Sequence, residues 1–321
     1  MWILLLISCK ANDTGRLHKA SRLLMGTLVE VTVAGPEDKA SPTIQAVFEE
    51  MKRVEDLTSF HKPSALTKLN EMAGNGPVKT DPELLAIISE SLKVAAQTQG
   101  AFDPTVGALS SLWSFSGGDA RLPGDSEISQ ALARVGWNKV KIDEERGTVL
   151  LPEQGMALDL GGIAKGYALD RSSEIIRKSG VSGGLVNAGG DVVAVGEKET
   201  GKPWRVGVRD PRNPNGILAV VDATDRAVMT SGDYERFFIE KGKRYHHILD
   251  SRTGYPVEGV QSLTLVAPRA TTALSCAAFA LGPEKALEYV ATVPGVEALL
   301  VDSHGEIHMT SGGEALFKSH R

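Results

Sequence analysis

Length, composition and charge set the first limits on what this protein is. The chain has 321 residues, of which 42% are hydrophobic and 23% are charged, as is typical of a globular protein with one large or two modest cores. Its formal net charge is -5 and its basic residues are scattered, so no positive field is available to collect nucleic acid or anionic lipid. We therefore expect no nucleic-acid binding.

The N-terminus carries a short apolar run that ends near a cysteine. Trp2 to Ile7 is followed by Ser8, Cys9 and the polar stretch Lys10 to Lys19. This pattern resembles the lipobox of bacterial lipoproteins, in which the cysteine becomes the lipidated first residue. The run is shorter than the ~20 apolar residues that span a bilayer, and it lacks the basic region of a complete export signal. We expect residues 1–20 to be an export signal, lipobox and tether. The alternative is an apolar terminus with an accidental cysteine.

Lipidation of Cys9 would have two consequences. It would hold the protein at the periplasmic or extracytoplasmic face of the inner membrane. It would also leave Cys276, the only other cysteine, without a disulfide partner, so the fold would depend on its core alone.

Hydrophobic periodicity predicts secondary structure along the rest of the chain. The first half of the chain is predicted to contain a strand over Met25–Gly35, helices over Ser41–Asp56, Asp81–Gly100 and Ser126–Val135, a hairpin turning at Glu144–Gly147, and a helix over Ile163–Lys178. Strands follow over Gly184–Gly196, Trp204–Val208 and Leu218–Ala223, and then a hairpin with strands Phe237–Glu240 and Tyr245–Leu249. The last predicted elements are helices over Thr272–Leu281 and Glu284–Thr292 and a strand pair around His304–Gly305. Hairpins interleaved with helices, without regular βαβ alternation, indicate an α+β fold with mixed, largely antiparallel sheets. No repeat or linker divides residues 21–321, which we expect to form one domain.

Three local patterns bear on chemistry. The pair Gly161 and Gly162 before a helix offers free N–H groups and a positive dipole end to an anion, although the spacing of a phosphate loop is missing. His246 and His247 are adjacent in a strand and point to opposite faces, so at most one of them lines a given site. Gly180–Gly184 matches G-x-S-x-G, but a helix precedes it and a strand follows, the reverse of a nucleophile elbow.

Several longer strings occur in one order along most of the chain. They are Met25–Thr27 (MGT), Ala101–Gly107 (AFDPTVG) with Leu112-Trp113 after it, Asp159–Asp170 (DLGGIAKGYALD), Asn187–Asp191 (NAGGD), Pro203–Gly207 (PWRVG), Thr230–Arg236 (TSGDYER) and His247–Pro256 (HILDSRTGYP). Together they resemble the FAD:protein FMN transferases, the ApbE family.

The resemblance implies a specific reaction. A Ser or Thr hydroxyl of an acceptor protein attacks the FMN-side phosphorus of FAD, AMP leaves, and FMN stays attached through a phosphodiester. This reaction needs a neutralised pyrophosphate, a positioned hydroxyl and a proton acceptor. FAD is then the substrate, Mg²⁺ the cofactor, and proteins of membrane redox complexes the acceptors. Two alternatives remain open: an FAD-binding lipoprotein without turnover, and an FAD pyrophosphatase that gives FMN and AMP.

The resemblance also implies the roles of individual residues. Flavin-nucleotide contacts are expected at Met25, Phe60, Ala101, Phe102, Asp103, Asp159, Lys165 and Ile248. His247 is the expected base, because its ordinary pKa of about 6.5 suits proton transfer at neutral pH, and Asp250 is expected to orient it or to help hold the metal. Without the family, Asp159 would cap the following helix, Lys165 would be solvated and both phenylalanines would be core residues. Ser251 replaces a proline that is common in the family and is expected to alter a turn.

The metal site departs from the family pattern. Gly162 matches a position whose backbone carbonyl holds the metal. Before Gly282 the family has an Asp and a Thr on one helix face, where this chain has Thr272 and Cys276. The site thus loses a formal negative charge, and a hard cation prefers oxygen donors to a thiol. Mg²⁺ is expected either to stay bound through these positions, Asp250 and the substrate phosphates, or to be held weakly by a protein that mainly binds FAD.

Overall fold

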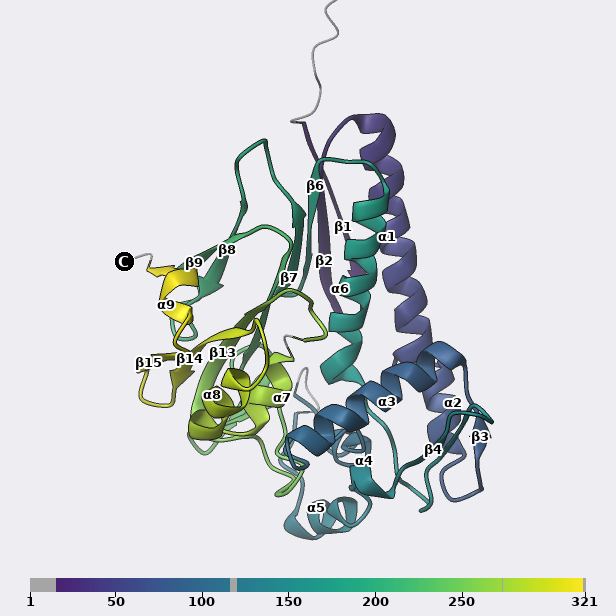
Figure 1. Cartoon of the computed structure of the whole chain (residues 1–321). Helices are drawn as coiled ribbons and strands as arrows, with labels where there is room; N and C mark the ends of the chain where they lie inside the picture. The colour runs from purple at the N-terminus through teal and green to yellow at the C-terminus, as the bar shows by residue number, and fades with distance from the viewer. Residues whose placement is uncertain (1–15, 116–119, 273, 320–321) are drawn as a thin grey trace, which may run out of the picture.

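The computed structural model describes residues 16–115, 120–272 and 274–319 (Figure 1). Cys9 and the predicted lipobox lie outside the described residues. Residues 17–20, which the sequence assigned to the tether, belong to strand β1 (Leu17–Leu24), which pairs antiparallel with β2 (Thr27–Ala34). An exposed edge strand has few buried positions, so its sequence lacks the hydrophobic alternation that predicts a strand. Its strand conformation comes from hydrogen bonding to the neighbouring strand.

An eight-stranded sheet forms the centre of the molecule, in the order β1-β2-β6-β7-β10-β13-β14-β15. The remaining strands are β6 (Gly183–Ala188), β7 (Asp191–Gly196), β10 (Arg226–Gly232), β13 (Val260–Ala267), β14 (Glu297–Asp302) and β15 (Ile307–Met309). Every neighbouring pair in this sheet is antiparallel. The predicted α+β class with largely antiparallel sheets is confirmed.

Helices cover one face of this sheet. The long helices α1 (Glu37–Thr58) and α6 (Gly161–Lys178) pack on each other and on the strands beneath them, with α7 (Ser275–Ala280) and α8 (Pro283–Ala291) beside them. Their apolar sides enter the largest core, which includes Val47, Leu169, Phe279 and Leu263. Among the described helices, none combines the length and apolar character needed to cross a bilayer.

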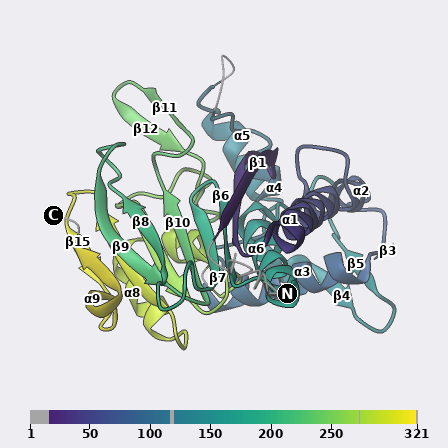
Figure 2. The ribbon, with the colours of Figure 1, turned by 90° about the horizontal axis from the view of Figure 1, so that it is seen from above.

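A second, smaller sheet covers part of the opposite face. It has the order β16-β9-β8, with β16 at Phe317–Ser319, β9 at Ile217–Ala223 and β8 at Trp204–Arg209, and α9 (Gly313–Leu316) precedes β16. Residues of both sheets share a core that includes Trp204, Val221, Val228 and Val266. The molecule therefore has a helical layer, a central sheet and a partial third layer (Figure 2).

The remaining elements gather at one end of α1 and α6 (Figure 1). They are α2 (Ala65–Glu71), α3 (Pro82–Gln97), α4 (Gly107–Ser110), α5 (Asp125–Leu132), the 3₁₀ turn at Trp137–Lys139, and a small sheet of β3 (Val78–Lys79), β4 (Lys141–Asp143) and β5 (Thr148–Leu150). Their core includes Leu84, Ile88 and Leu158, and it reaches Ile163 of α6. This packing brings the predicted flavin-contact loop to the start of α6.

The hairpin of β11 (Phe237–Glu240) and β12 (Lys243–His246) stands out from the sheet (Figure 2). An aromatic stack fastens it to the loop after α4. Trp113 lies 5.9 Å from Tyr245 between ring centroids, and Tyr245 lies 5.3 Å from Phe238. The Trp113 indole N–H also donates to the Gly254 carbonyl at 3.0 Å, so the segment that follows the hairpin is held as well.

Two predicted elements differ from the observed ones. The strand predicted over Gly184–Gly196 is a hairpin of β6 and β7 that turns at Gly189 and Gly190, both of which have positive φ. The helix predicted from Thr272 begins only at Ser275, after a turn. Periodicity did not single out β10 and β13. All of β13 is buried, so it lacks the alternation that marks a half-exposed strand.

Candidate active site

The start of α6 is tied to the predicted flavin-contact loop. The Asp159 carboxylate accepts a hydrogen bond from the Gly161 N–H and another from the Ser110 hydroxyl, each at 2.9 Å. The Asp159 N–H donates to the Pro104 carbonyl at 2.7 Å. Asp159 therefore does support the first turn of the helix, and it also joins the helix start to the loop that begins at Ala101.

Lys165 is paired rather than solvated. Its ammonium contacts the carboxylate of Asp191, which is 4% exposed and also accepts the Thr230 N–H at 3.1 Å. A buried carboxylate needs such partners, because burying an unpaired charge is very costly. Lys165 itself remains partly exposed, so its charge is available to a ligand. Asp191 was missed by the assignment of site residues, although it closes one of the family-like strings.

Gly162 and Cys276, two of the positions predicted to hold the metal, are in contact. The Cys276 thiol donates to the Gly162 carbonyl, with sulfur and oxygen 3.4 Å apart. A Cβ atom at Gly162 would lie 2.7 Å from that sulfur and 2.8 Å from the Phe102 ring, so only glycine fits there. Burial, together with the charges of Asp191 and Asp159, raises the pKa of Cys276 to about 12 against the influence of Lys165. The residue is a neutral thiol at physiological pH.

Thr272 does not share a helix face with Cys276. Thr272 lies in a turn, where its N–H donates to the Arg269 carbonyl at 3.2 Å. Helix α7 begins only at Ser275. The spacing of four residues therefore does not stack the two side chains as it would on a helix, and the predicted ligand geometry is corrected on this point. A distant contact holds the residues just before Thr272, because Asp170 of α6 accepts hydrogen bonds from the backbone of Ala270 and Thr271.

His247 is held by the main chain of Arg236. Its N–H donates to the Arg236 carbonyl at 3.1 Å, and its Nδ1 lies 3.3 Å from the same oxygen. This contact assigns the ring proton to Nδ1 and leaves Nε2 as a proton acceptor. Burial, together with the charges of Arg236, His246 and Lys165, lowers the pKa of His247 to about 3. His247 is thus a neutral imidazole beside positive charges.

The neighbouring histidine faces the core. The two residues were expected to be adjacent in a strand, but β12 ends at His246 and His247 lies in the bend that follows. His246 is buried, its Nε2 lies 2.8 Å from the Val257 carbonyl, and its ring packs edge-on against Phe279. Asp250 behaves differently from the expectation. Its carboxylate forms a bidentate pair with Arg252 at 2.8 and 2.9 Å, and it does not contact His247. The carbonyl of Arg236, rather than Asp250, orients the imidazole.

The remaining predicted flavin contacts surround this region in different ways. Asp103 is buried, and its oxygens accept from the Thr105 N–H, the Thr105 hydroxyl and the Trp137 N–H at 2.6–2.9 Å, so the carboxylate organises its own loop. Burial raises the pKa of Asp103 against these hydrogen bonds. Ala101, Phe102 and Ile248 are core residues, Phe60 is half-buried against His61, and Met25 sits in the β1–β2 turn with φ of 51°.

Ser251 joins the two halves of the site. Its buried hydroxyl contacts the Gly100 carbonyl and lies 3.4 Å from the Ala101 carbonyl. The histidine-led loop is therefore fastened directly to the flavin-contact loop, across 150 positions of sequence. Sequence reasoning expected only an altered turn here, because a hydroxyl's distant partner leaves no local signal.

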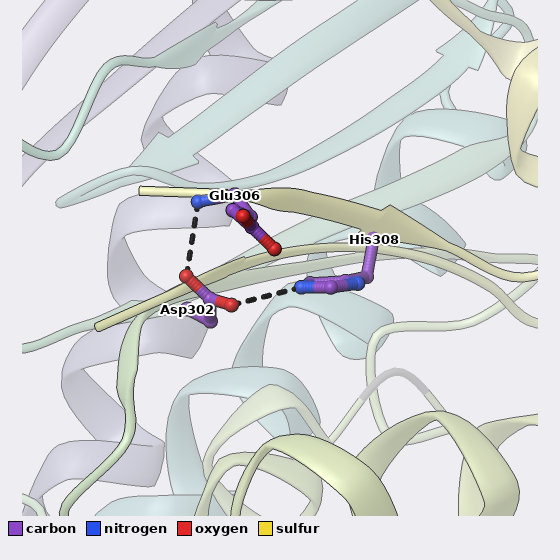
Figure 3. A group of neighbouring side chains, drawn as sticks. All are labelled: Asp302, Glu306 and His308. Atoms are coloured by element: carbon purple, nitrogen blue, oxygen red, sulfur yellow. Dashed lines mark hydrogen bonds and ion pairs between the residues drawn. The ribbon is translucent and has the colours of Figure 1, made fainter. Parts of the chain in front are cut away.

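A separate group of metal-ligating side chains lies far along the sheet from β1 (Figure 3). It consists of Asp302, Glu306 and His308 in the β14–β15 hairpin, and it is the one group of three such residues within the described ranges. Asp302 already accepts from the His304 N–H, the Glu306 N–H and His308 Nε2 at 2.8–2.9 Å. These contacts account for the group as the closure of a hairpin, and none of its residues was predicted for the flavin site.

Comparison with known proteins agrees with this geometry. Residues 25–300 match the family model described as the ApbE family. The chain belongs to the ApbE family. A curated relative from Treponema pallidum, named FAD:protein FMN transferase, is 34% identical over 95% of this chain and 90% of its own length. A relative of the same name from Salmonella typhimurium is 30% identical over 94% of this chain and 90% of its own length.

Solved structures of the family share the fold. The crystal structure of the ApbE protein from Thermotoga maritima has a TM-score of 0.87 and 38% identity, and it covers 95% of this chain and 100% of its own. The apo form of the Pseudomonas stutzeri flavinyl transferase ApbE has a TM-score of 0.82 and 26% identity, and it covers 95% of this chain and 98% of its own. The ApbE resemblance inferred from the sequence is confirmed.

Acid is expected to destabilise the protein through His247. The folded state lowers the pKa of His247 from 6.5 to about 3, so as the pH falls the unfolded state binds this proton first. The contribution of the neutral ring is complete above about pH 6.5 and is lost progressively toward pH 3. His247→Gln has no titrating ring, so this pH-dependent loss of stability is absent from the variant. Between pH 7 and pH 5 the melting temperature of the variant should fall less than that of the wild type, and equal falls would contradict the assignment.

Removing the Ser251 hydroxyl is expected to loosen the junction between the two loops. Ser251→Ala leaves a buried carbonyl without its donor, which should lower the free energy of unfolding by about 1–3 kcal/mol. Denaturant unfolding measures this loss. Ser126→Ala, an exposed serine on α5, is the matched control and should stay within about 0.5 kcal/mol of the wild type. Similar values for both variants would refute the role of Ser251.

Proposed function

We propose that the protein is an FAD:protein FMN transferase, which moves FMN from FAD to a Ser or Thr hydroxyl of an acceptor protein and releases AMP. The observation that carries this proposal is a cation and a neutral base beside a helix N-terminus. Lys165 follows the Gly162 turn on α6, is held there by Asp191 and remains partly exposed, and its charge is one of the causes that lower the pKa of both His247 and Cys276. This is the arrangement that a dinucleotide diphosphate and an attacking hydroxyl require.

The roles follow from the contacts. Lys165 and the positive end of the α6 dipole would neutralise charge on the diphosphate, because a cation and a helix N-terminus both favour anions. Nε2 of His247 would take the proton of the acceptor hydroxyl as its oxygen bonds to the FMN-side phosphorus. The bond from that phosphorus to the AMP oxygen then breaks, and AMP leaves. Asp191 would hold Lys165 in place.

Mg²⁺ is the cation that the family resemblance implies, and we propose that the diphosphate provides most of its ligands. Gly162 and Thr272 offer neutral oxygens, whereas the Cys276 thiol is protonated and already donates to the Gly162 carbonyl. Asp250 is neutralised by Arg252 and is left out. This donor set has no carboxylate, so Mg²⁺ would take from the substrate phosphates the negative charge that one or two protein carboxylates usually supply, and it would keep several waters. When bound, the ion would supply further charge neutralisation at the phosphates.

We also propose export and lipid anchoring at Cys9, with acceptors among the flavin-carrying subunits of membrane redox complexes. The support is the lipobox-like run that ends at Cys9. Strand β1 begins at Leu17, and eight extended residues reach roughly 27 Å at most, so a lipid at Cys9 would keep the domain close to the membrane.

One incubation tests the proposed reaction. The protein is mixed with FAD, Mg²⁺ and an acceptor domain whose target Ser or Thr carries a free hydroxyl, and intact mass and AMP release are measured. We expect the acceptor to gain the mass of FMN less one water, which is the mass of FAD minus that of AMP, and His247→Gln to slow the transfer by at least about 100-fold. Lys165→Met should impair transfer, whereas Lys178→Met, an exposed lysine on the same helix, should not. Free FMN with AMP would indicate a pyrophosphatase, and intact FAD an FAD-binding protein.

Restoring a carboxylate should strengthen the cation site. Thr272→Asp returns the charge that the family has at this position, so the Mg²⁺ concentration for half-maximal AMP release should fall by about tenfold. Thr272→Ser keeps a hydroxyl and is the control, with an unchanged Mg²⁺ requirement. If a chelator leaves the wild-type rate unaffected and Thr272→Asp changes nothing, the assignment of the cation to this site is wrong.

A further inference from the structure

One face of α6 receives a single segment of the chain along three successive turns. Gly162, Gly166 and Asp170 are spaced by four residues and therefore lie on the same side of the helix. Gly162 meets Cys276, and a Cβ atom at Gly166 would lie 3.1 Å from the Ala270 carbonyl. Residues 269–271 and Cys276, on either side of Thr272, thus lie against this face.

Asp170 makes the polar contacts of this packing. Its carboxylate accepts from the Ala270 N–H at 2.8 Å, the Thr271 N–H at 3.1 Å and the Thr271 hydroxyl at 2.5 Å. Arg269 Nε adds an ion pair at 3.3 Å. The Asp170 side chain is only 7% exposed. These donors take the place of the hydrogen bonds to water that the carboxylate gives up on burial.

All of these donors belong to three consecutive residues, Arg269, Ala270 and Thr271. The buried charge of Asp170 therefore stabilises one local conformation of the segment rather than the general packing of α6. It also separates the roles of two adjacent threonines. The Thr271 hydroxyl is committed to Asp170, whereas Thr272 follows it in the turn that leads to α7.

We propose that Asp170 is a positioning residue for the cation and diphosphate site. By holding the backbone of Ala270 and Thr271, it sets where the Thr272 hydroxyl lies relative to the Gly162 carbonyl. The inference rests on the proposed function, because that function assigns Thr272 and Gly162 to the diphosphate and its Mg²⁺. Residues that orient a metal ligand typically change metal affinity or activity by about 10–100-fold when they are replaced.

FAD binding, followed by flavin fluorescence with and without Mg²⁺, tests this role without requiring turnover. In Asp170→Asn we expect the Mg²⁺ concentration that half-saturates the cation-dependent part of FAD binding to rise by about tenfold or more. FAD affinity without Mg²⁺ should stay within about twofold of the wild-type value. Ser173→Ala, which removes a buried α6 hydroxyl bonded only to the Leu169 carbonyl, is the matched control.

A milder pair of variants covers the case in which Asp170→Asn does not fold. Thr271→Val removes one donor and leaves the Asp170 carboxylate, so it should raise the Mg²⁺ concentration that half-saturates the cation-dependent part of FAD binding. Thr271→Ser keeps the hydroxyl and should show the wild-type value. If Asp170→Asn and Thr271→Val lower the melting temperature but leave the Mg²⁺ dependence of FAD binding unchanged, Asp170 is purely structural and the proposal is wrong.

Hydrogen exchange separates this inference from the proposed function. In the ligand-free protein, the Ala270 and Thr271 amides should exchange faster in Asp170→Asn than in the wild type or in Ser173→Ala. Unchanged exchange would overturn the positioning role whatever the enzyme does. Faster exchange in a protein whose wild type binds FAD and transfers nothing would support the positioning role and reject the transferase activity.

Discussion

Close approach at the start of α6 is the constraint on which the candidate site depends. Gly162 admits the Phe102 ring from one side and the Cys276 thiol from another, and Gly166 admits the backbone around Ala270. A methyl group at Gly162 would collide with both neighbours, because its carbon would lie closer to the Cys276 sulfur and to the Phe102 ring than non-bonded atoms can pack. Small residues on this face allow three distant segments to meet at the N-terminal end of the helix.

Charge pairing then decides what the meeting point can do. Buried Asp191 holds Lys165, and buried Asp170 holds the segment that leads to Thr272, so the two acidic groups are each satisfied within the protein. The net effect at the site is a partly exposed ammonium and a neutral imidazole, since positive neighbours and burial both keep the proton off His247. An anionic ligand completes such a site, whereas a cationic ligand would meet repulsion.

The two cores explain why the flavin-contact loop and the histidine-led loop come together. In the flavin-contact loop, Phe102 packs in the core of the smaller helical end, whereas Ala101 packs in the largest core. Ile248, next to His247 after the β11–β12 hairpin, belongs to that same largest core. Trp113 and Ser251 bridge them through contacts with carbonyl groups, which are directional and so fix the relative position of the loops. The stacked rings of Trp113, Tyr245 and Phe238 add apolar area to the same junction.

The sequence by itself determined the features that are written locally. Amphipathic periodicity predicted α1, α3 and α6 and the β11–β12 hairpin, and the family-like strings identified the family and the glycine turn. The antiparallel α+β class followed from the same patterns, because a helix or a hairpin depends on neighbours within a few residues. Thr272 and Cys276 were also visible as departures from the family pattern at that stage.

Only the tertiary structure decided which partner each polar group has. Asp191 meets Lys165 from 26 positions away and Asp170 meets Ala270 from 100 positions away, while Asp250 turns to Arg252 instead of His247. It also decided that residues 17–20 join a strand and that α7 starts at Ser275. These outcomes depend on contacts between distant segments, which compete with local propensity and leave no periodic trace in the sequence.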